Sequence, residues 1–180
     1  MTLIVCPLSD VPDICSAHRP SHLLTLLSPG SETPVVPEDV APDRRLWLAV
    51  NDIAEHRDGL VAPHAGLVEE LLAFSADWRR DRAFVIHCWA GISRSTAAAF
   101  TVACQHFPDL PEARIAQALR QASPVATPNR LIVALADRAL DRQGRMIAAI
   151  DAIGRGEEAM MGSPFELRLS DIAWNPPRTA

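Results

Sequence analysis

The sequence has 180 residues, of which 48% are hydrophobic and 22% are charged, as is ordinary for a globular chain with a sizeable core. The formal net charge of -5 disfavours broad binding to nucleic acid or to an anionic membrane surface. No apolar stretch reaches the roughly 18–20 residues that a membrane-spanning helix needs, and the first residues lack the pattern of a secretory signal. We therefore expect a cytoplasmic protein without a nucleic-acid or membrane partner.

The four cysteines are spread along the chain, without CxxC spacing and without the density of a disulfide scaffold. No cluster of cysteine and histidine has the spacing of a zinc site. We expect free thiols, no metal and no cofactor.

Four short apolar runs have the composition of buried strands, and polar residues or prolines bound them. They cover residues 3–5, 22–27, 46–50 and 83–86. Between residues 29 and 43 the chain holds four prolines and a glycine, which predicts a surface connection.

Apolar residues at helical spacing predict an amphipathic helix over residues 65–78. A run of small residues at 95–100 begins a second helix, and residues 115–122 again follow helical spacing. Thr127 followed by Pro128 predicts the start of a long helix that runs past Gly144 to residue 150, because proline suits the first helical position.

Strands and helices alternate and then give way to a run of helices. This order predicts an α/β fold with a central, mostly parallel sheet flanked by helices. We expect residues 1–153 to form the main domain. Residues 154–180 are then a C-terminal extension that packs on it through apolar side chains, namely Phe165, Leu167, Leu169, Ile172 and Trp174.

One segment between a predicted strand and a predicted helix carries the chemistry. It reads His87, Cys88, Trp89, Ala90, Gly91, Ile92, Ser93, Arg94 and Ser95. A loop of this length can curl so that successive backbone N–H groups point at one anion, and the positive end of the following helix adds to that field. Gly91 allows an unusual backbone conformation, and Arg94 can grip two oxygens with its planar fork.

These donors would also stabilise negative charge on sulfur, so Cys88 is expected to be a thiolate at neutral pH. The alternative for a free cysteine is a small buried hydrophobic residue, which we expect for the other three cysteines.

The segment resembles the signature loop of the cysteine-dependent protein tyrosine phosphatase superfamily, in which His-Cys is followed by five residues, Arg and then Ser or Thr. The sequence of residues 90–95, Ala-Gly-Ile-Ser-Arg-Ser, most resembles that of the dual-specificity phosphatases. The resemblance implies the fold of that type, a phosphocysteine intermediate on Cys88, phosphate binding by residues 89–94, and a supporting role for His87. It also implies that Ser95 hydrogen-bonds the departing thiolate.

Phosphatases of this kind need a general acid to neutralise the leaving oxygen. The family places an aspartate at the end of an earlier strand, and residues 46–50 run directly into Asn51 and Asp52. Asp52 lies 36 residues before Cys88, and Asp58 lies 30 residues before it. Asp52 is the preferred acid and Asp58 the alternative. A segment ending at Asn129 resembles a Pro-Asn stretch of the family, to which we assign loop support.

The uncharged side chains between Cys88 and Arg94 favour a phosphotyrosine protein, with possible dual specificity, or a small phosphate monoester. An inositol phosphate is an alternative substrate, because His56, Arg57 and His64 could supply positive charge near the site. A catalytically silent phosphate-binding module is a second alternative. A rhodanese-like sulfurtransferase is disfavoured by the His-Cys start and the Arg-Ser end of the loop.

Overall fold

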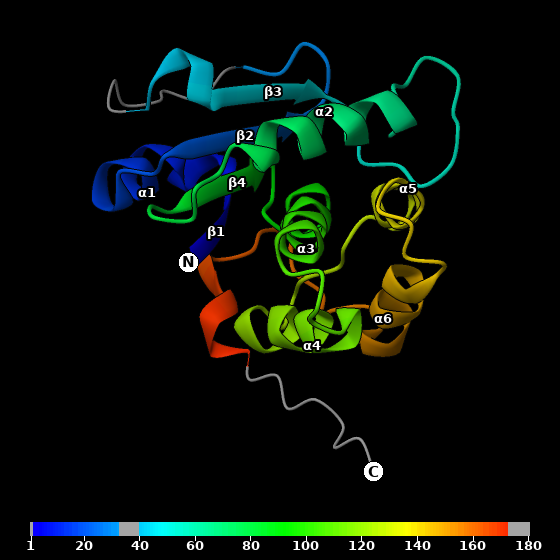
Figure 1. Ribbon diagram of the computed structural model, residues 1–180. Coiled ribbons are helices and arrows are strands. Elements are labelled where there is room, and N and C mark those ends of the chain that lie inside the picture. The colour runs from blue at the N-terminus through cyan, green and yellow to red at the C-terminus, as the bar shows by residue number, and fades with distance from the viewer. Residues whose placement is uncertain (1, 33–39, 173–180) are drawn as a thin grey trace.

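The computed structural model describes residues 2–32 and 40–172. Five strands form one sheet in the order β3-β2-β4-β1-β5 (Figure 1). The first four are parallel to their neighbours, and β5 runs antiparallel to β1. The predicted mostly parallel sheet is therefore confirmed. The strands are β1 (Thr2–Pro7), β2 (His22–Leu27), β3 (Arg45–Ala49), β4 (Phe84–Cys88) and β5 (Phe165–Arg168).

Helices cover both faces of this sheet (Figure 1). They are α1 (Val11–His18), α2 (Ala65–Ala76), α3 (Arg94–His106), α4 (Glu112–Ala122), α5 (Arg130–Ala139) and α6 (Arg145–Ile153). Short 3-10 helices occupy Leu8–Asp10, Pro42–Arg44 and Leu169–Asp171. Within the described ranges, no helix combines the length and the apolar character needed to cross a membrane.

The core has two parts because alternate residues of a strand point to opposite faces of the sheet. Leu3 and Val5 of β1 pack in the larger cluster with residues of α2 to α6, whereas Ile4 and Cys6 pack in a smaller cluster with α1. Helix α1 was not predicted from the sequence. It is short and follows β1 closely, so its few apolar residues gave no helical period.

The prediction of one long helix after Thr127 is wrong in two respects. Its start lies at Asn129, whose side chain caps α5 by accepting from the N–H groups of Leu131 and Ile132 at 3.1 Å. The helix also stops, and α6 begins after Gly144, which has φ +86°.

Asp137 explains why two helices form instead of one. This buried carboxylate accepts from the N–H of Gly144 at 2.7 Å and of Met146 at 2.9 Å, and so satisfies the first turn of α6 from the end of α5.

The chain after α6 returns to the sheet, where β5 lies beside β1 (Figure 1). Phe165 and Leu167 of β5 and the following Leu169 are buried against the main core, and Ile172 is partly buried there. Trp174 lies outside the described residues. Packing of this segment was expected from its apolar residues, but the strand was not predicted.

Candidate active site

The loop of interest joins the carboxyl end of β4 to the amino end of α3. Cys88 is the last residue of β4 and is 2% exposed, and Arg94 is the first residue of α3. The Sγ of Cys88 lies 3.1 Å from the Oγ of Ser95. The nucleophile candidate and the hydroxyl assigned to assist it are therefore in hydrogen-bond contact.

Gly91 lets the loop curl against the end of β1. Its φ of +71° is in the left-handed region that favours glycine. A Cβ built at this position would lie 2.8 Å from the backbone N of Pro7 and 2.9 Å from the carbonyl carbon of Cys6. Glycine is therefore required here both by the backbone angle and by the close approach of β1.

The loop carbonyls point away from the centre of the curl, because surrounding N–H groups hold them. The acceptor and donor pairs are Trp89 O with Leu8 N (3.1 Å), Ala90 O with Gly162 N (2.8 Å), Ile92 O with Thr127 N (2.9 Å) and Ser93 O with Asn129 N (3.3 Å). Over the described residues, the N–H groups of 89–93 donate to no protein acceptor. Together with the amino end of α3 they form a cradle of donors suited to an anion.

Arg94 is buried at the end of this cradle with only 5% of its surface exposed. Its Nη1 donates to the carbonyl of Val50 at 2.7 Å and contacts the Oγ of Ser28 at 3.5 Å. Its Nε is buried without a protein acceptor, and no carboxylate forms an ion pair with it in the described part of the chain. A buried cation without a counter-charge is costly, and a bound anion would offset that cost.

Asp52 faces the same cavity as Cys88. The cavity has a volume of about 440 Å³, and its lining includes Ser28, Asp52, Cys88, Arg94 and Met160. One carboxylate oxygen of Asp52, Oδ1, accepts from Ser93 Oγ at 2.7 Å and from Asn129 Nδ2 at 2.9 Å. The other oxygen, Oδ2, has no hydrogen bond from the described residues.

The alternative acid lies elsewhere. Asp58 is fully exposed in the loop after β3 and faces His56, whose Nε2 lies 3.5 Å from its carboxylate. It does not line the cavity that contains Cys88. The structure brings Asp52, and not Asp58, to the cysteine.

His87 is completely buried beside Cys88 and binds the adjacent strand. Its Nε2 lies 2.7 Å from the Oγ1 of Thr25, its partner across the β2–β4 ladder. Burial is the main cause that lowers the pKa of His87 to about 4; a hydrogen bond with the Cys88 backbone opposes it, and the nearby Arg94 cation adds a smaller lowering effect. The imidazole is therefore neutral at neutral pH and joins β4 to β2.

Solved structures share this arrangement of elements. Human DUSP28 superposes with a TM-score of 0.59 and 22% identity over 78% of this chain and 94% of that chain. A mouse dual-specificity phosphatase complexed with zinc tungstate gives a TM-score of 0.57 and 21% identity over 82% and 86% of the two chains. The human tyrosine phosphatase-like serine/threonine/tyrosine-interacting protein superposes with a TM-score of 0.58 and 18% identity over 78% of this chain and 92% of that chain.

The chain has the dual-specificity phosphatase fold. Neither a protein-family model nor a curated protein sequence matches it. The structural likeness at these identities establishes the fold that was predicted from the His-Cys-x5-Arg-Ser segment.

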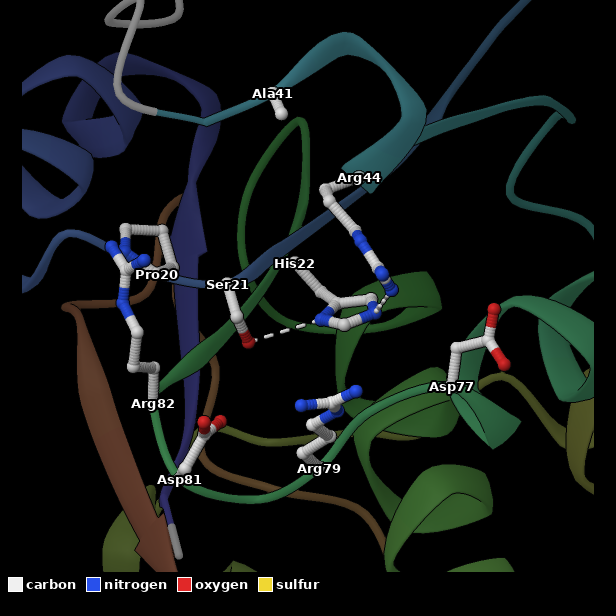
Figure 2. Close-up of a pocket in the computed structure, with 9 residues that line it drawn as sticks. All are labelled: Pro20, Ser21, His22, Ala41, Arg44, Asp77, Arg79, Asp81 and Arg82. Atoms are coloured by element: carbon white, nitrogen blue, oxygen red, sulfur yellow. Dashed lines mark hydrogen bonds between the residues drawn. The ribbon is translucent and has the colours of Figure 1, made fainter.

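The dual-specificity phosphatase fold places the cradle where the parallel strands end, since β2, β3 and β4 all lead into the cavity. A second cavity, of about 380 Å³, lies at their opposite ends (Figure 2). There Arg44 contacts the Nε2 of His22 at 3.2 Å, and the Nδ1 of His22 lies 3.0 Å from Ser21 Oγ. This cavity contains none of the residues of the cradle.

Three residues that contribute to the site were not placed in it from the sequence. Asn129 was assigned loop support, although it contacts Asp52 directly. The Pro-Asn resemblance was the available signal for it. Met160 and Ala159 line the cavity from the C-terminal extension, and no local pattern indicated this. No group of three or more potential metal ligands is present among the residues that the structure describes.

Proposed function

We propose that this chain is a cysteine-dependent phosphatase that hydrolyses phosphate monoesters, chiefly protein phosphotyrosine with possible dual specificity, through a phosphocysteine intermediate. The observation that carries the proposal is that Cys88, Arg94 and Asp52 line one cavity above a cradle of free N–H groups. This combination supplies a nucleophile, an anion clamp and a carboxyl group at the same point.

In the first step the thiolate of Cys88 attacks phosphorus, and the bond between phosphorus and the ester oxygen breaks. The proton on Oδ2 of Asp52 moves to the leaving oxygen, because Oδ1 already accepts two hydrogen bonds. The loop N–H groups and Arg94 bind the three equatorial oxygens as negative charge develops on them.

In the second step water attacks the phosphocysteine and gives its proton to the Asp52 carboxylate. The sulfur–phosphorus bond breaks, and inorganic phosphate leaves. The sulfur departs as a thiolate that the O–H of Ser95, 3.1 Å away, can stabilise by donating a hydrogen bond.

The lining of the cavity favours a monoester over a highly anionic inositol phosphate. Among the described residues that line it, Arg94 alone is cationic. His56 faces Asp58 in an exposed loop, and neither it nor Arg57 reaches the cavity. The cationic charge that lines this cavity is thus matched to a single phosphate.

We also assign the catalytic domain to residues 1–153 and treat residues 154–180 as a C-terminal extension, whose described part packs on that domain through the pairing of β5 with β1. All four cysteines are free and buried. Free thiols support a reducing compartment, so we assign the reaction to the cytoplasm.

The test is hydrolysis of a small aryl phosphate in the presence of a chelator. We expect Cys88→Ser to lose ~10³-fold or more in kcat. Arg94→Lys keeps the charge but loses the planar fork, and we expect a loss of ~10²–10³-fold. Thermal unfolding of each variant provides the check on folding.

The acid is tested with a matched pair. We expect Asp52→Asn to lose ~10²–10³-fold in kcat, whereas Asp58→Asn stays within about twofold of wild type. A wild-type protein that is inactive on aryl phosphates, phosphopeptides and inositol phosphates, but still binds them, would establish the silent binding module instead.

A further inference from the structure

The C-terminal extension does not leave the molecule directly after α6 but crosses the anion-binding loop. The N–H of Gly156 donates to Thr127 Oγ1 at 3.1 Å, and the N–H of Glu157 donates to the carbonyl of Pro124 at 3.0 Å. Further along, the N–H of Gly162 donates to the carbonyl of Ala90 within the loop itself. Backbone hydrogen bonds therefore fix this segment on both sides of residues 158–161.

Tight packing accompanies these hydrogen bonds. A Cβ on Gly156 would lie 2.5 Å from the carbonyl carbon of Val125. One on Gly162 would lie 3.3–3.4 Å from the carbonyl oxygens of Ala90 and Gly91 and from a side-chain carbon of Ile92. The segment is seated on the loop at distances that leave little room for movement.

Met160 projects from the middle of this fixed segment. Met160 is one of the residues that line the cavity containing Cys88, and 90% of its surface is exposed. Trp89 lines the same cavity and is 54% exposed. Two large, exposed apolar residues therefore lie at the same cavity. A ligand that buried their apolar surface would gain binding free energy.

The neighbouring methionine behaves differently. Met161 is 45% exposed, does not line the cavity, and its Sδ lies 3.8 Å from the Oγ of Ser9. The two methionines thus have the same chemistry but different positions relative to the cradle.

We infer that Ala159 and Met160, held by the fixed backbone of residues 156–162, form a substrate-recognition wall of the active site, in which Met160 contacts the organic group that carries the phosphate. The inference rests on the proposed function, because it requires the phosphate to lie at Cys88 and Arg94. A thioether interacts favourably with an aromatic ring, whereas the short alkyl arm of phosphoserine offers it little contact area. The substrate class favoured by this wall is an aryl phosphate.

The first experiment compares Met160→Ala with the matched control Met161→Ala. For each protein, kcat/KM is measured on a phosphotyrosine peptide and on the same peptide carrying phosphoserine. Met160→Ala is expected to lower kcat/KM for the phosphotyrosine peptide by ~3–10-fold. Its kcat/KM for the phosphoserine peptide should stay within about twofold of the wild-type value. Met161→Ala is expected to change neither value. Equal losses on both peptides, or no loss on phosphotyrosine, would overturn the inference.

Binding separates this inference from the proposed function. If the wild type hydrolyses neither the peptides nor aryl phosphates and inositol phosphates, the proposed function fails, and calorimetry then compares O-phosphotyrosine with inorganic phosphate. The wall predicts that Met160→Ala raises the Kd for O-phosphotyrosine by ~3–10-fold and leaves the Kd for inorganic phosphate unchanged. An unchanged Kd for O-phosphotyrosine, or binding of neither ligand by wild type, contradicts the wall.

Discussion

The side-chain amide of Asn129 donates a hydrogen bond of 2.9 Å to Oδ1 of Asp52, although 77 positions separate the two residues. The opposite atom of the same side chain, Oδ1, accepts from the first N–H groups of α5 and so has a fixed direction. The orientation of the carboxyl group that faces Cys88 is therefore set by a helix cap on the other side of the site.

Removing the Asn129 amide is expected to impair acid catalysis without unfolding the protein. Asn129→Ser keeps an N-cap oxygen for α5 but cannot donate the amide hydrogen bond to Asp52. We expect kcat to fall ~10-fold on an alkyl phosphate, which needs protonation of its leaving oxygen, and less on an activated aryl phosphate. An equal loss on the two substrates would show a general structural effect, and urea unfolding tests stability independently.

Ser95→Ala is expected to slow the second chemical step more than the first. The variant removes the O–H that lies 3.1 Å from the Cys88 sulfur and leaves the remainder of the cradle in place. Phosphocysteine should then accumulate, and a rapid-mixing assay with a chromogenic aryl phosphate should show a burst close to one product per enzyme. A steady rate without a larger burst than wild type would argue against this role.

Gly91→Ala is expected to destabilise the fold more than Gly30→Ala. Both glycines have positive φ, +71° and +77°, but a Cβ on Gly30 has no atom within 4 Å, whereas one on Gly91 meets the β1 backbone. Gly30→Ala should cost about 1 kcal/mol of unfolding free energy, through the backbone angle alone. Gly91→Ala should cost about 3 kcal/mol or more, because overpacking adds to it. Similar urea midpoints for the two variants would contradict the close approach.

Arg142 is expected to contribute far more to stability than Arg145, although both reach Glu112. The side chain of Arg142 is 11% exposed, and its guanidinium also donates to the carbonyls of Cys104 and Pro108, whereas the side chain of Arg145 is 51% exposed. Arg142→Ala leaves the buried Glu112 carboxylate poorly paired and should cost about 3–5 kcal/mol. Arg145→Ala should cost less than about 1 kcal/mol, as for an exposed ion pair. Chemical unfolding of the two variants decides between these values.

Stability should fall on acidification partly through His87. Its pKa is about 4 in the folded protein, mainly because of burial, and about 6.5 in an unfolded chain. Between these values the unfolded state binds the proton and the folded state does not. The unfolding free energy therefore drops by about 3 kcal/mol as the pH falls from about 6.5 to about 4, and this contribution is constant below that.

The control for this pH effect is His87→Gln, which removes the titrating group. His22 and His106 also have pKa values lowered by burial, so part of the pH dependence persists in the variant. The difference in slope between wild type and His87→Gln isolates His87. Equal slopes between pH 4 and 6.5 would exclude its contribution.

Much of the fold could be predicted from the sequence because local patterns of apolar and polar residues determine it. The run at residues 22–27 matches β2 in both bounds, and the run at 83–86 overlaps β4, which begins one residue later and continues two residues further to Cys88. The anion-binding loop could be predicted from the sequence because its chemistry requires Cys88 and Arg94 at a fixed separation. Apart from the short helix α1, sequence and structure agree best where one short segment contains all the interacting parts.

The features that were not predicted depend on contacts between distant segments. The break between α5 and α6 depends on Asp137 accepting hydrogen bonds from residues seven and nine positions ahead. β5 is a strand because β1 offers it an edge. Likewise, the contact of Asn129 with Asp52 and the position of Met160 arise only when the loops are assembled.

The place of the C-terminal extension has a consequence for how the protein matures on the ribosome. Synthesis is vectorial and domains begin to fold from the N-terminal side. Every residue of the cradle, through Asn129, emerges before the wall and before β5 (Phe165–Arg168), which closes the free edge of β1. A nascent chain would therefore hold most of the anion cradle while its sheet still has an unpaired edge, and the Gly162 N–H that holds the Ala90 carbonyl would be added last, together with the wall.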